Sequence, residues 1–253
     1  MLYRDIAPVS SEAWKEIDQR AEEVLKTYLA ARRVVNVVGP KGLDYNAIPE
    51  GRLTGINEVD GIYHGNYQVL PLTETRVEFE INRWELDNVN RGAQDVDYEP
   101  LEAAMVKLAL FEDKIVFDKL DEEIENKVLN FGKDGKAMMD AISEGVLLLK
   151  KAFVNPPYTL VVSPKAYQMI HSEANNYPLS KRIEKIIDGE IIINHAIEGV
   201  YLLPFNHEDL QLTIGRDFSI GYQNHNNETV RFFAKESFAF RVLDKAIFIK
   251  YNL

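Results

Sequence analysis

The first pattern of apolar and polar positions along the chain is helical. After Ser10 and Ser11, which are candidate N-caps, apolar side chains recur at spacings of three and four residues, as they do on one face of a helix. We therefore predict an amphipathic helix over residues 11–32, whose opposite face carries mixed charges that water can solvate. Its apolar face consists of Trp14, Ile17, Ala21, Val24, Leu25, Tyr28 and Leu29.

Three further stretches have the helical period. The longest is predicted over residues 98–130, with Asp97 as its N-cap. Apolar residues at helical spacing over 138–149 and 179–187 predict two shorter helices. The pair Ser163-Pro164 combines a cap residue with a first-turn proline, so we expect another helix to begin there.

Other stretches follow the period of a strand. Strict alternation of apolar and polar residues over 76–82 predicts a strand with one buried face, and β-branched runs predict strands at 34–38 and 158–162. A long helix followed by a strand-rich C-terminal part indicates the α+β class. The later β runs are 191–193, 200–203, 210–214, 218–222, 229–233, 238–242 and 246–251.

Residues 43–70 fit neither pattern. A stretch of this length without regular structure is uncommon inside a compact domain. Its apolar side chains argue against disorder, yet they have little local core in which to be buried. We predict a long hairpin that reaches onto another subunit. The glycines here are Gly51, Gly55, Gly61 and Gly65, and the apolar residues are Tyr45, Ile48, Leu53, Ile56, Val59, Ile62, Tyr63 and Tyr67.

Composition and charge narrow the class of protein. With 46% hydrophobic and 27% charged residues the chain is typical of folded soluble proteins, and the absence of cysteine excludes disulfides and thiol catalysis. Residues 1–130 carry 15 basic and 26 acidic side chains, which account for the whole net charge of −11. Binding to nucleic acid depends on an excess of Lys and Arg, so we expect no nucleic-acid partner. Neither a signal peptide nor a membrane span is apparent, and we expect a cytoplasmic protein without a membrane partner.

Motifs for catalysis and metal binding are missing. None of the five histidines has a partner at the i, i+4 spacing of a helical metal site. The sequence around Ser219 lacks the first glycine of a nucleophile elbow, and residues 132–136 lack the spacing of a phosphate-binding loop. Carboxylates are plentiful, so counting alone leaves a catalytic or metal-binding pair of acids open. We predict no catalytic residue and no metal site.

Eight segments, in this order, resemble the encapsulin family of bacterial and archaeal shell proteins. Each segment is weak alone, but together they cover nearly the whole chain. They are WKEID at 14–18, RR at 32–33 with GP at 39–40, WELDN at 84–88, FED at 111–113, PYTLVV at 157–162, YPL at 177–179 with KR at 181–182, GRDFSIGY at 215–222 and ESFAFRV at 236–242.

The resemblance implies the fold of tailed-phage major capsid proteins, with an N-terminal helix, a long spine helix, an extended loop, and peripheral and axial domains. The axial domain would surround the fivefold vertices and their pores. By position, the implied division is 1–42 for the N-terminal helix and first strand of the peripheral domain, 43–72 for the extended loop, 73–133 for the peripheral domain with the long helix, 134–224 for the axial domain and 225–253 for the last peripheral strands.

The implied function is a self-assembling icosahedral shell of roughly 60 copies, or a multiple of that number. It would enclose a dye-decolorising peroxidase or a ferritin-like iron-oxidising protein, for oxidative-stress response or iron storage, and would not itself be an enzyme. A phage-type capsid that packages a genome is the alternative, although an inner wall facing DNA usually benefits from basic charge. A stand-alone enzyme or secreted bacteriocin-like factor is a third, disfavoured by the missing motifs and signal peptide.

In similar shells a groove on the inner wall holds a short C-terminal tail of the cargo protein. Grooves between helices and strands bind extended peptides through apolar pockets and backbone pairing. Leu25 and Tyr28 could equally be core residues, because a groove floor also needs apolar side chains. By position, the resemblance assigns to this groove Leu25, Tyr28, Arg32, Val34, Asn36, Phe232, Ala234 and Glu236.

The resemblance also implies a cofactor site. The shell requires no cofactor, but some similar shells carry a flavin stacked on the tryptophan that aligns with Trp84. Arg76 and Tyr177 match that tryptophan's neighbours in those shells. Flavin is therefore the cofactor that we expect at these three residues.

Overall fold

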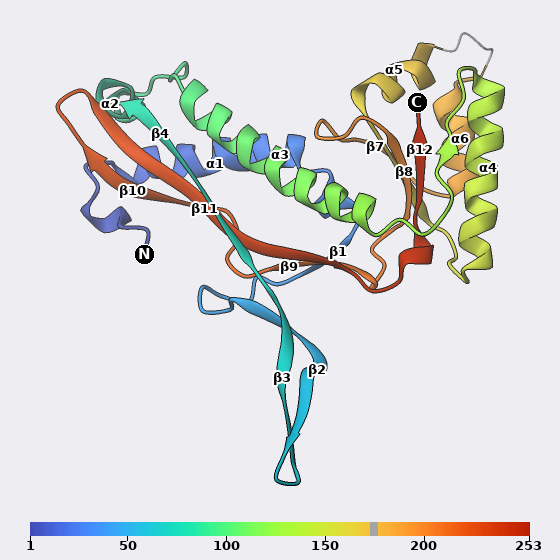
Figure 1. Cartoon of the computed structure of the whole chain (residues 1–253). Helices are drawn as coiled ribbons and strands as arrows, with labels where there is room; N and C mark the ends of the chain where they lie inside the picture. The colour runs from blue at the N-terminus through green and yellow to red at the C-terminus, as the bar shows by residue number, and fades with distance from the viewer. Residues whose placement is uncertain (173–176) are drawn as a thin grey trace.

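A body built on two β-sheets carries a long hairpin that projects from it (Figure 1). The computed structural model describes residues 1–172 and 177–253. Helices pack against both sheets. The buried apolar side chains of the described residues form two clusters, one of which draws on a single sheet and the other on both. The predicted α+β class is confirmed.

The N-terminal helix, α1 (Ser11–Tyr28), ends before the predicted boundary at residue 32. The carboxylate of Asp113 accepts hydrogen bonds from the next two backbone amides that leave the helix, Ala30 at 3.0 Å and Ala31 at 2.9 Å. A carboxylate far away in the sequence thus sets where this helix stops. Short 3-10 turns lie at η1 (Arg4–Ile6), η2 (Ala31–Arg33) and η3 (Lys245–Ile247).

The long helix, α3 (Glu99–Glu122), also ends before its predicted boundary at residue 130. Beyond it, the Asn126 Nδ2 donates hydrogen bonds to two carbonyl groups of the C-terminal segment, at 2.8 and 3.0 Å. These bonds direct the chain into the short strand β5 (Leu129–Asn130) instead of further helix. The helix α2 (Arg83–Arg91) was not predicted.

The first sheet has a long central strand, β11 (Thr229–Val242), where the sequence predicted two short ones. Its other strands are β1 (Asn36–Val38), β4 (Thr73–Asn82), β9 (Leu210–Ile214) and β10 (Ser219–His225). Residues 229–238 pair with β4 and residues 238–242 pair with β9, so the ladder continues without a break. On the face under α1, the Phe232 ring lies 5.3 Å from Trp14 and 5.4 Å from Phe79, centroid to centroid.

The second sheet is built around a fully buried strand, β6 (Tyr158–Val162). It pairs parallel to β7 and antiparallel to β8. The predicted cap at Ser163 is confirmed, because its Oγ accepts a hydrogen bond from the Ala166 amide at 3.3 Å. The remaining elements of this half are β7 (Ile191–Ile193), β8 (Val200–Pro204), β12 (Ile249–Asn252), α4 (Gly135–Lys151), α5 (Pro164–Ser172) and α6 (Leu179–Ile187).

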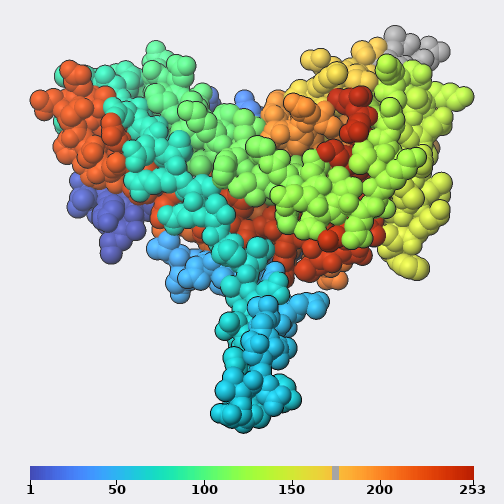
Figure 2. Space-filling view, viewed as in Figure 1, coloured from blue at the N-terminus to red at the C-terminus, as the bar shows by residue number. Residues whose placement is uncertain are grey.

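The hairpin itself is confirmed, and it projects from the body (Figure 2). Its contact with another subunit stays a prediction. Its strands are β2 (Ala47–Val59) and β3 (Ile62–Pro71), joined by Asp60 and Gly61 at φ of 51° and 77°. Positive φ at both turn positions gives a tight turn whose twist suits the two strands. The exposed apolar side chains of the hairpin are Leu53, Ile56, Val59, Ile62, Tyr63, Tyr67 and Val69.

Candidate functional site

A groove of about 760 Å³ lies between α1 and the segment that leads into β10. We call it the α1 groove. Its walls combine apolar side chains with charged ones, which suits an extended peptide better than a small apolar ligand. The lining residues used below are Leu25, Leu29, Arg32, Arg33, Asp217, Phe218 and Ile220.

A second groove, of about 680 Å³, begins on the other side of η2. Arg32 and Arg33 line both grooves, so the two are neighbours across this turn. Val37, which is 39% exposed, and Phe205, which is 53% exposed, supply apolar surface to the second groove. An extended chain lying in the α1 groove could therefore continue past Arg33.

The structure separates the eight predicted cargo-binding residues into three groups. Leu25 and Arg32 line the α1 groove. Asn36 donates a hydrogen bond at 3.1 Å to Asn206, which lines the second groove, whereas Tyr28 lines neither groove and packs against the ring of His195. The third group has no exposed surface and lines neither groove: Val34, Phe232, Ala234 and Glu236.

Arg32 is the centre of a buried ion network beneath the α1 groove. Its guanidinium binds Glu112 through Nε, at 2.9 and 3.0 Å, and through Nη2 at 2.6 Å. Nη2 also donates to Glu236 at 3.0 Å, and Nη1 donates to Asp217 at 2.7 Å. The same guanidinium lies 4.6 Å from the centre of the Phe218 ring. With 17% of its side chain exposed, Arg32 holds the groove together and presents no free charge.

Burial sets the electrostatics of this network. It raises the pKa of the Glu236 carboxyl well above its ordinary value, and the neighbouring charge of Glu112 raises it further. Burial also raises the pKa of the Asp113 carboxyl to about 7. The hydrogen bonds from the Ala30 and Ala31 amides act in the opposite direction and lower that pKa. For Arg32, burial lowers the pKa, but Glu112 and Asp217 outweigh that effect and hold the guanidinium firmly charged.

Sequence reasoning missed Asp217, Phe218 and Ile220 as groove residues. They belong to the GRDFSIGY segment at 215–222, which supported the family resemblance but was not assigned to the cargo groove. The network joins this segment to three others of the eight, those that contain Arg32, Glu112 and Glu236. Segments that are weak signals separately therefore meet at one buried site.

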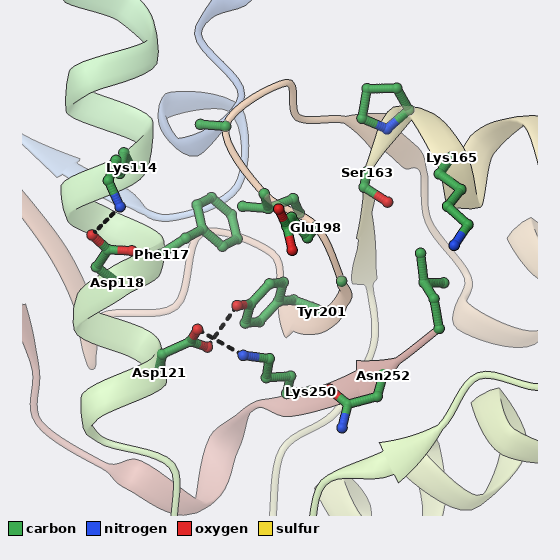
Figure 3. Close-up of a pocket in the computed structure, with 15 residues that line it drawn as sticks. Lys114, Phe117, Asp118, Asp121, Ser163, Lys165, Glu198, Tyr201, Lys250 and Asn252 are labelled. Carbon is green, nitrogen blue, oxygen red and sulfur yellow. Dashed lines mark hydrogen bonds and ion pairs between the residues drawn. The ribbon is translucent and has the colours of Figure 1, made fainter.

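A further cavity, of about 950 Å³, lies between α3 and the second sheet (Figure 3). Asp121 accepts hydrogen bonds at 2.6 Å from the Tyr201 hydroxyl and from the Lys250 ammonium, and Lys114 pairs with Asp118 at 2.7 Å. The two Asp121 contacts hold α3 against β8 and β12, whereas the Lys114–Asp118 pair lies within α3. Within the described residues, no group of three or more His, Asp or Glu side chains could hold a metal ion.

The three residues expected to bind flavin do not meet within one chain. Trp84, 65% exposed, lies on α2, while Tyr177, 60% exposed, lies next to α6 at the opposite end of the body (Figure 1). The guanidinium of Arg76 is 3.9 Å from the centre of the Phe233 ring and donates to Gln223 at 3.0 Å. A single subunit therefore does not form this flavin site.

Comparisons with known proteins agree with this architecture. The Linocin_M18 family model, described as "Encapsulating protein for peroxidase", matches residues 1–239. The type 1 encapsulin shell protein of Rhodococcus erythropolis is 36% identical over 249 residues, which cover 94% of each chain. That of Mycobacterium tuberculosis is 34% identical over 249 residues, again with 94% of each chain covered.

Among solved structures, a virus-like particle from Pyrococcus furiosus matches with a TM-score of 0.70 at 15% identity, over 94% of this chain and 98% of that one. A chain from Mycobacterium phage Che8 matches with a TM-score of 0.55 at 14% identity, over 84% and 85%. Within the described residues, no helix is long and apolar enough to cross a membrane. The chain has the fold of tailed-phage capsid proteins and belongs to the encapsulin family of shell proteins.

Proposed function

We propose that this protein assembles with copies of itself into a closed icosahedral shell in the cytoplasm, of roughly 60 subunits or a multiple. The shell encloses a cargo enzyme, a dye-decolorising peroxidase or a ferritin-like iron-oxidising protein, and has no catalytic activity of its own. In this way it serves oxidative-stress response or iron storage. The division into peripheral and axial domains given above stays a prediction.

The projecting hairpin is the observation that carries self-assembly. An isolated two-stranded hairpin is marginally stable in water, and the side chains of Ile62, Tyr63 and Tyr67 are 69%, 73% and 80% exposed. Burying an apolar side chain of this size contributes about 1.5–3 kcal/mol. A second copy of the chain that covered the hairpin would therefore gain substantial binding energy.

The α1 groove supports the cargo proposal. Leu25 and Phe218 provide apolar contacts for a tail, while Arg33, 52% exposed, offers a charge between the two grooves. We propose that a cargo tail lies along the α1 groove and passes Arg33 toward Asn36. Val34, Phe232 and Ala234 then act through the packing of the floor.

Two measurements on the purified protein test this function. Light scattering and negative-stain microscopy should show closed particles, whereas a monomer or small oligomer under native conditions would refute the shell. Mass spectrometry should identify a peroxidase or ferritin-like protein that copurifies with the particles. Nuclease-protected nucleic acid inside them, without such a protein, would favour the alternative of a genome-packaging capsid.

A flavin site is compatible with this proposal only between subunits. Trp84 is exposed enough to stack on a planar ring, but Tyr177 must come from another copy of the chain. We therefore propose that flavin, where it is held, is held by the assembled shell. Absorption spectra of purified shells and of the Trp84→Ala variant test this, and shells without flavin absorbance contradict it.

A further inference from the structure

The ion network under the α1 groove contains more buried acid than base. Glu112, Asp113 and Glu236 have no exposed surface, and Arg32 is the one cation that bonds to them among the described residues. A buried charge is stable only when it is paired or fully hydrogen-bonded. Asp113 meets this condition through two backbone amides, so Glu112 and Glu236 must share a single guanidinium.

The two carboxylates accept unequal numbers of hydrogen bonds from that guanidinium. Glu112 accepts three contacts of 2.6–3.0 Å from Arg32, whereas Glu236 accepts one contact of 3.0 Å at Oε2. The Glu236 Oε1 is buried without a hydrogen-bond partner among the described residues. As an anion, Glu236 is therefore the least stabilised member of the network.

Among the residues that the structure describes, no cation other than Arg32 pairs with Glu236. Opposite it on β4 is Thr75, whose Oγ1 is likewise buried without a partner in the part of the chain that the structure describes. The adjacent Lys235 pairs with Glu74, and alternation along β11 places it on the other face of the sheet. Helix α3 brings two further carboxylates, on Glu112 and Asp113. The segment before β10 brings the carboxylate of Asp217 and the guanidinium of Arg216, whose Nε donates to the Ser219 hydroxyl at 3.2 Å.

The network also forms part of the groove wall. Arg32 binds Asp217 at 2.7 Å and lies over the ring of Phe218, and the Asp217 carboxylate accepts the Phe218 amide at 2.8 Å. We propose that Glu236 is a positioning residue that carries a proton: its neutral carboxyl leaves Arg32 free to hold Asp217 and Phe218 in the wall. Loss of that proton loosens the wall and weakens the groove.

The direction of the pH effect follows from linkage. The pKa of Glu236 is raised in the folded protein, so its stabilising contribution is complete at low pH and is lost as the pH rises through the raised value. The groove wall is therefore firmest below the raised pKa of Glu236 and loosens above it. This inference rests on the proposed function only in taking the α1 groove as the cargo site.

Hydrogen exchange of the wall tests the proposal without any cargo. Assembled shells are compared at about pH 6 and about pH 9, and exchange is corrected for its intrinsic pH dependence. Residues 216–222 in the wild type should lose protection, by up to about tenfold per pH unit, as the pH rises toward the raised pKa of Glu236. The Glu236→Gln variant, whose amide mimics a neutral carboxyl, should lose no protection over this pH range. The control is Glu80→Gln, which alters an exposed carboxylate paired with Arg231 and should show the pH dependence of the wild type.

Equal pH dependence in the wild type and Glu236→Gln would overturn the proposal. Infrared titration of the wild-type shell gives a second measurement that does not depend on folding of a variant. It should show a protonated carboxyl that persists well above the pH at which an ordinary glutamate loses its proton, and its absence would also overturn the assignment. Either failure would overturn this inference without deciding whether the shell assembles or binds cargo. The two measurements monitor only the groove wall and the Glu236 proton.

Discussion

Replacing Arg32 by alanine should destabilise the folded subunit far more than removing a comparable arginine from the surface. Arg32 bonds Glu112 and Glu236, neither of which is exposed. Truncating one partner of a buried ion pair costs about 3–5 kcal/mol, because the remaining charge is left buried and unpaired. For a chain of this length the corresponding fall in Tm is roughly 6–20 °C.

The matched control is Arg231→Ala. Arg231 bonds Glu80 with the same chemistry, but the two side chains are 43% and 38% exposed. An exposed pair contributes about 0–1 kcal/mol, so this variant should unfold within about 1 kcal/mol of the wild type. Thermal and urea unfolding followed by circular dichroism measure both variants on the same scale.

The pH dependence gives an independent check. In Arg32→Ala the stranded Glu112 carboxylate can be neutralised by a proton, so the penalty should shrink when unfolding is measured at about pH 5 instead of about pH 8. Adding Glu112→Gln to Arg32→Ala should restore part of the lost stability, because it removes that stranded charge. Equal effects of Arg32→Ala and Arg231→Ala, or no recovery in the double variant, would refute the assignment of a buried network.

Three further outcomes are expected. Leu25→Asp should leave the particles intact but strongly reduce the cargo that copurifies, because a charge would occupy an apolar position of the groove. Thr27→Asp, on the exposed side of α1, should leave the amount of cargo unchanged, and mass spectrometry of the particles compares the two variants. Ile62→Ser with Tyr67→Ser should prevent assembly in light scattering without changing the circular dichroism of the subunit, unlike Glu58→Ser on the same hairpin. Phe232→Ala should cost about 3–5 kcal/mol in urea unfolding, because it leaves a cavity between Trp14 and Phe79, and a cost under about 1 kcal/mol would contradict that packing.

The sequence by itself determined the elements that depend on local periodicity. The amphipathic face of α1, the strand at 158–162, the cap at Ser163 and the hairpin of 43–70 were all predictable, because they are encoded by neighbouring residues. The order of eight segments was also enough to identify the family, since order along the chain survives where each segment alone has diverged.

Tertiary structure decided where those elements end and which residues meet. Helix α1 stops at Tyr28 because Asp113 captures the next amides, and β11 is one strand because two different partners extend its ladder. Neither cause is visible locally, since both depend on hydrogen bonds to residues far away in the chain.

The candidate site depended on tertiary structure most of all. Position along the sequence placed Phe232 and Ala234 in the groove, but packing against α1 buries them beneath it. Folding likewise brings Arg32, Glu112 and Glu236 from three separate segments into contact. Charge alone predicts a solvated residue for each of them, and only burial around a shared guanidinium makes them a network under the groove.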